Sequence, residues 1–232
     1  LYYAVNSENS AFGNSAGTDS DNSISCTYIG QNADNDNFAN AYTNSTALGH
    51  DARMTASNQV RIGSSAVTSI GGFTTWSNVS DGRYKKDVNE NVPGLSFIQK
   101  LRPVTYHLDI HALADHLHED PSDVRNPEAK TTPTAATVQA RDEKENLLVS
   151  GFIAQEVEQA AQSIGYEFSG VDAPKNDSDL YGLRYAEFVV PLVKAVQELS
   201  TQNAALQQTL LALQQEVELL KAKVDASPIN KD

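Results

Sequence analysis

Apolar residues follow three different patterns along the chain, and each pattern predicts a different structure. In residues 1–79, single apolar residues are scattered among Asn, Ser and Gly, whereas residues 80–187 contain short apolar runs between polar segments. From residue 188 onward, apolar residues recur at intervals of four and three. The first pattern predicts short strands, and the second predicts a mixture of short strands and short helices. The third pattern predicts one long helix. We therefore divide the chain into segments 1–79, 80–187 and 188–232.

The first segment contains four copies of a motif in which an apolar residue is followed by Gly, two variable residues and Ala. The copies lie at 12–16, 29–33, 48–52 and 62–66, and their glycines are 17, 19 and 14 residues apart. Each copy is too short to bury its apolar residue alone, so the repeat predicts stacked coils of a β-solenoid. A flexible linker is the alternative, but a linker would not place an apolar residue before each of these glycines.

The last segment is a heptad repeat, in which leucines seven residues apart alternate with a second series of seam residues. The expected seam is Leu192, Val196, Leu199, Asn203, Leu206, Leu210, Leu213, Val217 and Leu220, with Val224 after it. We expect these residues to form a coiled coil between copies of the chain. Asn203, the one polar seam member before Val224, is interpreted as a determinant of register and oligomeric state. The pattern alone does not separate a dimer from a trimer.

Composition excludes several classes of function. The net charge of −13 and the lack of a basic cluster beyond Lys85 and Lys86 argue against nucleic acid as a partner. No apolar run is long enough for a membrane span, and Cys26 is the only cysteine, so no intrachain disulfide is expected. The chain begins at Leu1 without an initiator Met, which is consistent with the C-terminal piece of a longer protein. The absence of a targeting signal therefore excludes little.

Ser80 and Lys85 lie where the composition changes. All eight prolines lie downstream, and the only cations upstream are Arg53 and Arg61. A serine beside a lysine can act as a nucleophile whose proton passes to a neutral amine. Because a free lysine has a pKa near about 10.4, folding would have to desolvate such an amine or place other cations beside it. Because this spacing is common by chance, the spacing alone favours a serine that caps a turn and a solvated lysine.

Further motifs follow Ser80 in a fixed order. They are Ser80-Asp81-x-Arg83-x-Lys85, Leu101-Arg102-Pro103-Val104-x-Tyr106, Gly151-Phe152-Ile153-Ala154-Gln155-Glu156-Val157, and Tyr185 before the heptad helix. This series resembles the intramolecular chaperone domain at the C-terminus of phage endosialidase tailspikes and other fibres, the S74 peptidases. The stretch from Thr46 to Gly63 resembles the head repeats of trimeric autotransporter adhesins.

The resemblance implies an α+β homotrimer with a β-solenoid-like fibre segment, a small mixed α/β chaperone module and a C-terminal trimeric coiled coil. In that family the domain trimerises, brings an upstream β-rich fibre into register and then cuts itself off. Carried onto this chain, the scissile bond is Val79–Ser80, with Ser80 as nucleophile and Lys85 as general base. Asp81 and Arg83 are interpreted as organisers of the loop.

The implied partners are other copies of the chain, its own upstream fibre segment, and a cell-surface or glycan target of the fibre. The implied location is a phage-type tail fibre or a bacterial surface fibre. Two other functions stay open. One is a non-cleaving trimerisation clamp of a structural fibre or adhesin, and the other is a membrane-tethered factor released by cleavage.

Several polar groups are weaker candidates, and neither a metal nor a cofactor is expected. The histidines His107, His111, His116 and His118 lie in or beside a long polar insertion at 111–146, and we interpret them as loop residues. Residues 34–37 (Asp-Asn-Asp-Asn) lack the glycine and glutamate of an EF-hand, which favours a polar turn. Trp76 is interpreted as a packing anchor at the fibre base. Helix N-terminal electrostatics explain Glu156 as well as a catalytic role does.

Overall fold

A computed structural model describes residues 8–18, 22–120 and 132–226 of this chain. It has a mixed α/β fold with a long C-terminal helix, which confirms the coarse fold class expected from the sequence. The chain forms two compact units, each assembled from separate stretches of sequence. The first unit comprises residues 1–81, 103–152 and 172–182, and the second comprises 82–102, 153–171 and 183–232.

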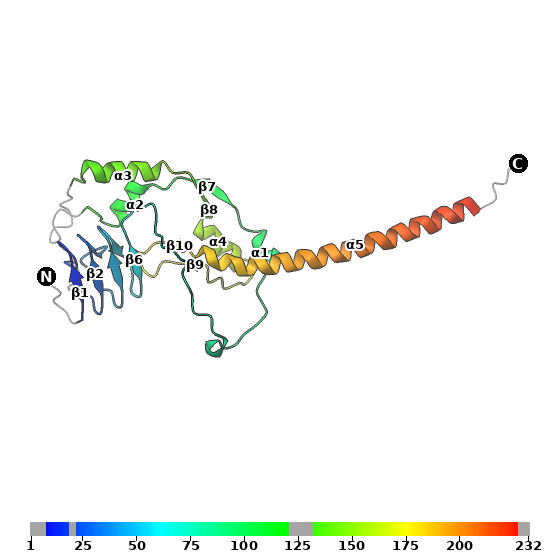
Figure 1. The fold of residues 1–232 in the computed structure, drawn as a ribbon, viewed down its shortest axis with the longest axis horizontal. Helices are drawn as coiled ribbons and strands as arrows, with labels where there is room; N and C mark the ends of the chain where they lie inside the picture. The colour runs from blue at the N-terminus through cyan, green and yellow to red at the C-terminus, as the bar shows by residue number, and fades with distance from the viewer. Residues whose placement is uncertain (1–7, 19–21, 121–131, 227–232) are drawn as a thin grey trace. The chain divides into compact units, whose positions relative to one another are not determined.

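The repeat motifs form a ladder of short parallel strands in the first unit (Figure 1). The strands, in spatial order, are β1 (Ser10–Phe12), β2 (Thr27–Ile29), β4 (Thr46–Leu48) and β6 (Val60–Ile62). Their register places the apolar residue of each motif, Phe12, Ile29, Leu48 and Ile62, opposite the next. A second parallel pair joins β3 (Asp34–Asn35) to β5 (Arg53–Met54).

The interior of this ladder explains the motif. Tyr28, Ala47 and Met54 are fully buried, while the apolar residue before each glycine faces outward and is exposed. Gly30 has φ +126°, and a Cβ at this position would collide with the carbonyl group of Gly49 in the next strand layer. Only glycine combines this backbone conformation with so close an approach between layers.

The segment 34–37 is not the polar turn expected from the sequence. Asp34 and Asn35 form β3, and both they and Asp36 are buried. The Tyr28 hydroxyl donates to Asn35 Oδ1 at 3.1 Å, and the Tyr42 hydroxyl donates to Asp36 Oδ1 at 2.7 Å. These phenols, brought from neighbouring coils, satisfy the buried polar atoms and allow the segment to enter the interior.

The insertion of the first unit begins and ends with strands. The alternating run 104–110 and the apolar run 147–154 predict strands, and each contains a shorter one. β7 (Val104–Tyr106) pairs antiparallel with β8 (Val149–Gly151). Between them lie α2 (Ile110–His116) and α3 (Ala135–Glu145), where we expected a long polar loop. The Asp109 and Thr134 side chains cap these helices by accepting from the Ala112 and Thr137 amides. The mainly polar sequence of α3 explains why the apolar pattern did not reveal it, whereas α2 carries Ile110, Leu113 and Ala114 at helical spacing and was missed because it is short.

The second unit packs around aromatic rings. Its elements are η1 (Gly82–Tyr84), α1 (Leu95–Ile98), α4 (Ala154–Gln162), η2 (Tyr185–Phe188) and α5 (Val189–Ala226). The Phe168 ring centroid lies 4.9 Å from that of Phe97 and 4.8 Å from that of Phe188. The Leu95 amide donates to Glu198 Oε2 at 2.8 Å, which ties α1 to α5. The short strands β9 (Val171–Asp172) and β10 (Gly182–Leu183) pair where the chain passes between the units.

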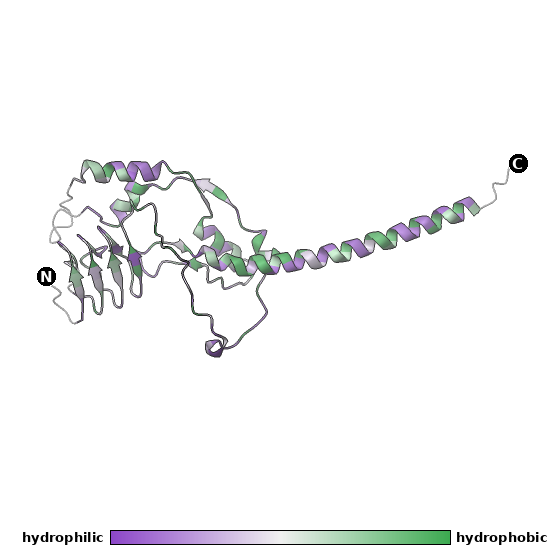
Figure 2. Cartoon of the chain, viewed as in Figure 1, coloured by the Kyte–Doolittle hydropathy of each residue, from purple (hydrophilic) through white to green (hydrophobic). Residues whose placement is uncertain are grey.

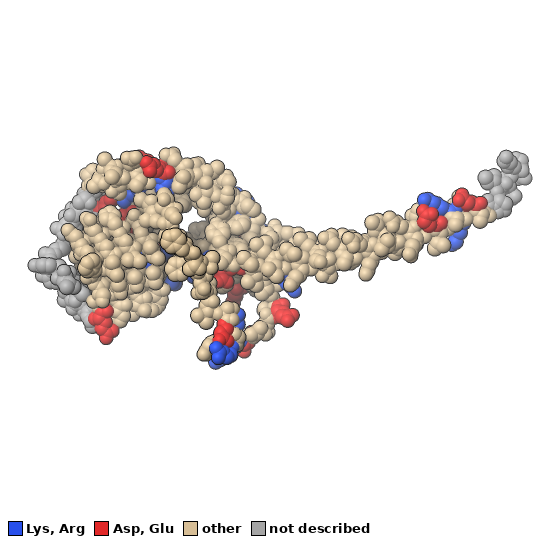
Figure 3. Space-filling view, viewed as in Figure 1, with Lys and Arg blue, Asp and Glu red and all other residues tan. Residues whose placement is uncertain are grey.

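Helix α5 confirms the long helix predicted from the heptads. Ser227 and Pro228, where the sequence predicts that this helix ends, lie outside the described residues. Apolar and polar residues alternate along it, and its seam leucines and valines are exposed (Figure 2). No charged residue occurs between Glu198 and Glu216, so the middle of the helix has an uncharged surface (Figure 3). Among the helices that the structure describes, none has the length and apolar character needed to cross a membrane.

Candidate functional site

Ser80 and Lys85 lie in a long exposed segment. From residue 67 to residue 91 every residue is exposed except Asp81, which is half-buried. Val79 is 92% exposed, and Trp76, which the sequence predicted as a packing anchor at the fibre base, is 85% exposed in the single chain. The only regular element in this segment is η1, visible as a single small turn in Figure 1. A peptide bond in such a segment can adopt the geometry that a nucleophile requires without disrupting a core.

The turn η1 sets the local position of Lys85. The Lys85 amide donates to the Gly82 carbonyl at 3.2 Å, which closes the turn directly after Ser80 and Asp81. The Arg83 guanidinium lies 5.7 Å from the centre of the Tyr84 ring, a cation–π contact consistent with a role in shaping the loop. Ser80 belongs to the first unit and Lys85 to the second. The catalytic pairing of these two residues therefore stays a prediction.

Arg102 and Glu156 form a contact between two of the sequence motifs, and sequence reasoning missed it. The Arg102 side chain donates from Nε and Nη2 to the two carboxylate oxygens of Glu156, at 3.0 and 2.5 Å. The hydrogen bonds from Arg102 lower the pKa of Glu156, and the same pair raises the pKa of Arg102. Glu156 stands in the first turn of α4, where the helix dipole also favours a negative charge.

This ion pair is a positioning feature rather than a source of stability. Both side chains are well exposed, and solvent screens exposed pairs strongly. Its two-bond geometry instead fixes the residues after α1 against the start of α4. The signal available in the sequence was the presence of an arginine and a glutamate in separate motifs, but nothing in the spacing joined them.

The histidines do not converge on one point. His107 Nδ1 is 3.0 Å from the Glu145 carbonyl oxygen, and His111 Nε2 is 2.7 Å from Asp142 Oδ1. His116 Nε2 is 3.0 Å from the Ser178 carbonyl oxygen, so each ring has a separate partner. Within residues 8–18, 22–120 and 132–226, no group of three or more His, Cys, Asp or Glu residues is placed to hold a metal ion. The structure gives these histidines contacts within the first unit.

Comparison with protein families identifies the module that carries these motifs. Residues 80–166 match the model of the Peptidase S74 family, which is described as the chaperone of endosialidase. The chain contains a chaperone-of-endosialidase domain. This confirms the family inferred from the motifs and supports a chaperone role. No curated protein and no solved structure matches the chain.

The matched region begins at Ser80 and contains Lys85, Arg102 and Glu156. The family is one of peptidases with self-cleaving members, and its chaperones act on a fibre partner. The start of the match thus coincides with the bond at which the sequence predicts a cut.

Proposed function

We propose that this chain is the C-terminal part of a phage or extracellular fibre, in which the chaperone domain trimerises, aligns the upstream repeats and cuts the Val79–Ser80 bond. One observation carries the proposal: the family match begins at Ser80, and the bond before it lies in an exposed segment. A cut before Ser80 breaks the covalent chain between the repeats and the start of the matched family region.

Two exposed apolar surfaces support assembly into a trimer. In the repeat segment, the in-register residues Phe12, Ile29, Leu48 and Ile62 form an apolar row on the outside of the strand ladder. On α5, the heptad seam is exposed along the helix. Contiguous apolar surfaces of this kind favour burial against another protein surface. We propose that copies of the chain cover both, as a β-solenoid fibre and a parallel coiled coil.

The proposed cut is an acyl shift followed by hydrolysis. Ser80 Oγ attacks the carbonyl carbon of Val79, while the Lys85 amine takes the hydroxyl proton. The Val79–Ser80 C–N bond then breaks, the Ser80 nitrogen accepts a proton, and an ester joins Val79 to the Ser80 side chain. Water hydrolyses the ester, leaving a Val79 carboxylate on one piece and a free Ser80 hydroxyl and amine on the other.

The proposed chemistry needs a buried Lys85 amine, and we propose that assembly buries it. A lysine acts as a base when burial disfavours its charged form, and Lys85 is exposed in the single chain. We propose that neighbouring copies bury the Ser80–Lys85 segment, together with exposed apolar residues such as Trp76 and Val79. Cleavage would then follow trimer formation and not precede it.

The decisive experiment follows cleavage of the expressed chain on a denaturing gel and by mass spectrometry. We expect wild-type protein to give two pieces that meet at Val79 and Ser80, and Ser80→Ala and Lys85→Ala to stay intact. Ser77→Ala and Lys86→Ala are matched controls and should cleave normally. A wild-type chain that stays intact would instead establish the non-cleaving clamp.

A second comparison tests whether cleavage depends on assembly. Leu206→Glu places a charge in the proposed seam, whereas Gln208→Glu places the same charge two residues away on the outer face of α5. We expect the first variant to sediment as a monomer and to stay uncut. The second should remain a cleaving trimer. Equal cleavage by both would separate the chemistry from the coiled coil.

A further inference from the structure

Two carboxylates downstream of Ser80 contact the last repeats upstream of it. Glu119 follows α2, and Asp179 lies in the loop between β9 and β10. Both belong to the first unit together with the repeat strands, and they are only 2% and 8% exposed. Acidic side chains are seldom buried so fully without a specific set of donors. Here the repeats supply donors to both carboxylates.

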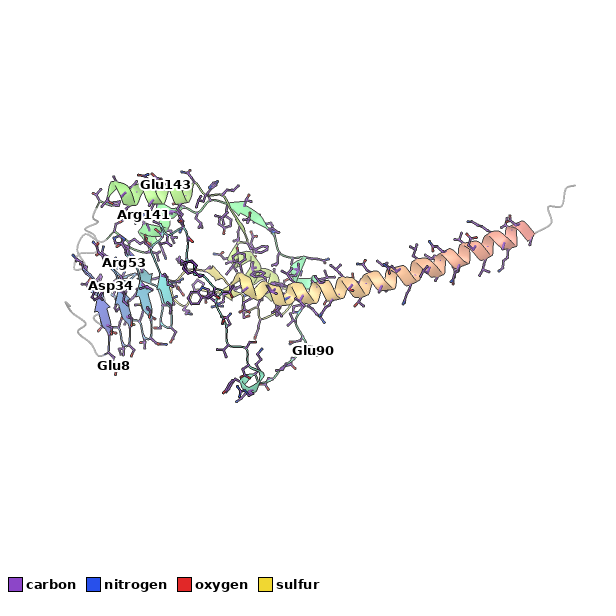
Figure 4. The ribbon with its side chains drawn as sticks, viewed as in Figure 1. Glu8, Asp34, Arg53, Glu90, Arg141 and Glu143 are labelled. Atoms are coloured by element: carbon purple, nitrogen blue, oxygen red, sulfur yellow. The ribbon has the colours of Figure 1, made fainter. Side chains whose placement is uncertain are left out.

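Glu119 binds the motif of the last repeat. The Ser65 amide donates to Glu119 Oε1 at 2.5 Å, and the Ser65 hydroxyl donates to Oε2 at 2.5 Å. Lys144 Nζ donates to the Ser65 carbonyl oxygen at 2.5 Å, so each polar group of Ser65 bonds to the insertion. Arg141, labelled on α3 in Figure 4, contacts Glu119 at 3.3 Å and Asp120 at 2.6 Å and offsets part of their negative charge. Burial raises the pKa of Glu119, although the hydrogen bonds from Ser65 oppose this effect.

Asp179 binds the turn between β5 and β6. Its Oδ1 accepts from Thr55 Oγ1 at 2.5 Å, from Gln59 Nε2 at 2.9 Å and from Arg61 Nη2 at 3.4 Å. In the same loop, Asn176 Nδ2 donates to the Thr55 carbonyl oxygen at 2.8 Å. Gln59 also accepts from the Thr55 amide at 3.1 Å, so Asp179 binds a turn that is already closed.

These contacts require folded repeats. The donors to Asp179 come from both ends of one turn, and those to Glu119 come from the backbone and side chain of one residue. An unfolded repeat would not present either set, and a buried carboxylate without its donors is strongly disfavoured. The two acids therefore select the folded form of the last repeats.

The contacts also bypass the proposed cut. Thr55 to Ser65 lie upstream of Val79, and Glu119 and Asp179 lie downstream of Ser80. The exposed segment 67–91 is the direct covalent path between them. Breaking that path removes none of the hydrogen bonds described above.

We propose that Glu119 and Asp179, with their donors Ser65, Thr55, Gln59 and Arg61, form a noncovalent latch that keeps the chaperone bound to the fibre after the Val79–Ser80 bond is cut. Cleavage and release are then separate events, and release requires the latch to open. The natural setting of the latch rests on the proposed cleavage, but the latch itself can be tested without it.

The test uses the full chain with Ser80→Ala, in which residues 72–79 are replaced by the recognition sequence of a site-specific protease. After digestion, size-exclusion chromatography and a denaturing gel show whether the two pieces elute together. We expect them to co-elute in this parent protein. With Glu119→Gln and Asp179→Asn together, we expect separate elution, because each lost charged interaction weakens binding by roughly 10- to 100-fold.

Two exposed acids in the same segments are matched controls. Glu143→Gln and Asp177→Asn change the same chemical groups without touching the latch, and their pieces should co-elute. Separation of the pieces in the parent protein would overturn the proposal, as would co-elution of the digested double variant. Either result is independent of whether Ser80 cleaves the natural bond.

A double variant that fails to fold before digestion would be replaced by changes on the fibre side. Ser65→Ala and Thr55→Ala remove hydroxyl donors and keep both carboxylates. We expect their digested pieces to separate at lower salt or urea concentrations than those of the parent. If the pieces of these variants separate at the same salt or urea concentrations as those of the parent, the result would contradict the latch.

Discussion

The segment 67–91 and the carboxylate latch connect the same repeats to the same downstream residues, but they do so in opposite ways. The segment is continuous covalent chain with almost no buried residue, whereas the latch consists of buried, charged hydrogen bonds. The repeats can therefore stay bound to the downstream residues through the latch even when the covalent chain between them is cut. The Val79–Ser80 bond lies in a segment without buried residues, so cutting it leaves the hydrogen bonds of the latch intact.

The largest contrast should come from deleting one acid in each region. Glu119→Ala leaves the Ser65 amide and hydroxyl without their buried acceptor, while Arg141 keeps its contact with Asp120, and we expect the free energy of unfolding to fall by about 2–4 kcal/mol. Glu90→Ala lies in the exposed segment, and we expect a change within about 0.5 kcal/mol. Urea unfolding of both variants in a Ser80→Ala background measures the difference. Equal losses would mean that the exposed segment is packed in the assembled protein.

Gly30 in the repeats and Gly71 in the exposed segment should respond differently to substitution by alanine. Gly30→Ala forces a Cβ into the next strand layer at a positive φ, and we expect a loss of at least about 2 kcal/mol in the stability of the repeats. At Gly71, in the exposed segment, a Cβ meets nothing within 4 Å, so Gly71→Ala should leave stability nearly unchanged. Thermal unfolding followed by circular dichroism distinguishes the two. A tolerated Gly30→Ala would contradict the close stacking of the layers.

The smallest expected effect is a pH dependence of the latch. Burial raises the pKa of Asp179, but the hydrogen bonds from Thr55 and Gln59 outweigh burial and leave the pKa below its ordinary value. A carboxylate whose pKa is lowered by folding stabilises the protein above its unfolded pKa, and this stabilisation is lost as the pH falls through the folded pKa. The stability difference between wild type and Asp179→Asn should therefore shrink below about pH 4. Urea unfolding midpoints of both proteins, measured between neutral and acidic pH, test this prediction. A stability difference that grows as the pH falls would contradict it.

Much of the local structure followed from short-range pattern. The recurring glycines predicted the strand ladder, and the heptads predicted α5, because both periodicities depend on neighbours a few residues away. The mainly polar sequence of α3 hid that helix, which begins after the cap Thr134. In α2, the cap Asp109 and the apolar residues Ile110, Leu113 and Ala114 at helical spacing were visible in the sequence. Because α2 has only 7 residues and lies in an otherwise polar insertion, this signal was missed.

The ordered motifs also determined the chaperone family, because Ser80, Arg102 and Glu156 occur in a series that a family comparison recognises. What only the tertiary structure decided is which polar groups meet: Arg102 with Glu156, Glu119 with Ser65, and Asp179 with Thr55. These partners are separated by 54, 54 and 124 positions in the chain. No local periodicity links residues so far apart. Whether an acid is solvated or buried depends on the donors that folding brings to it, and a pattern of neighbouring residues does not contain that information.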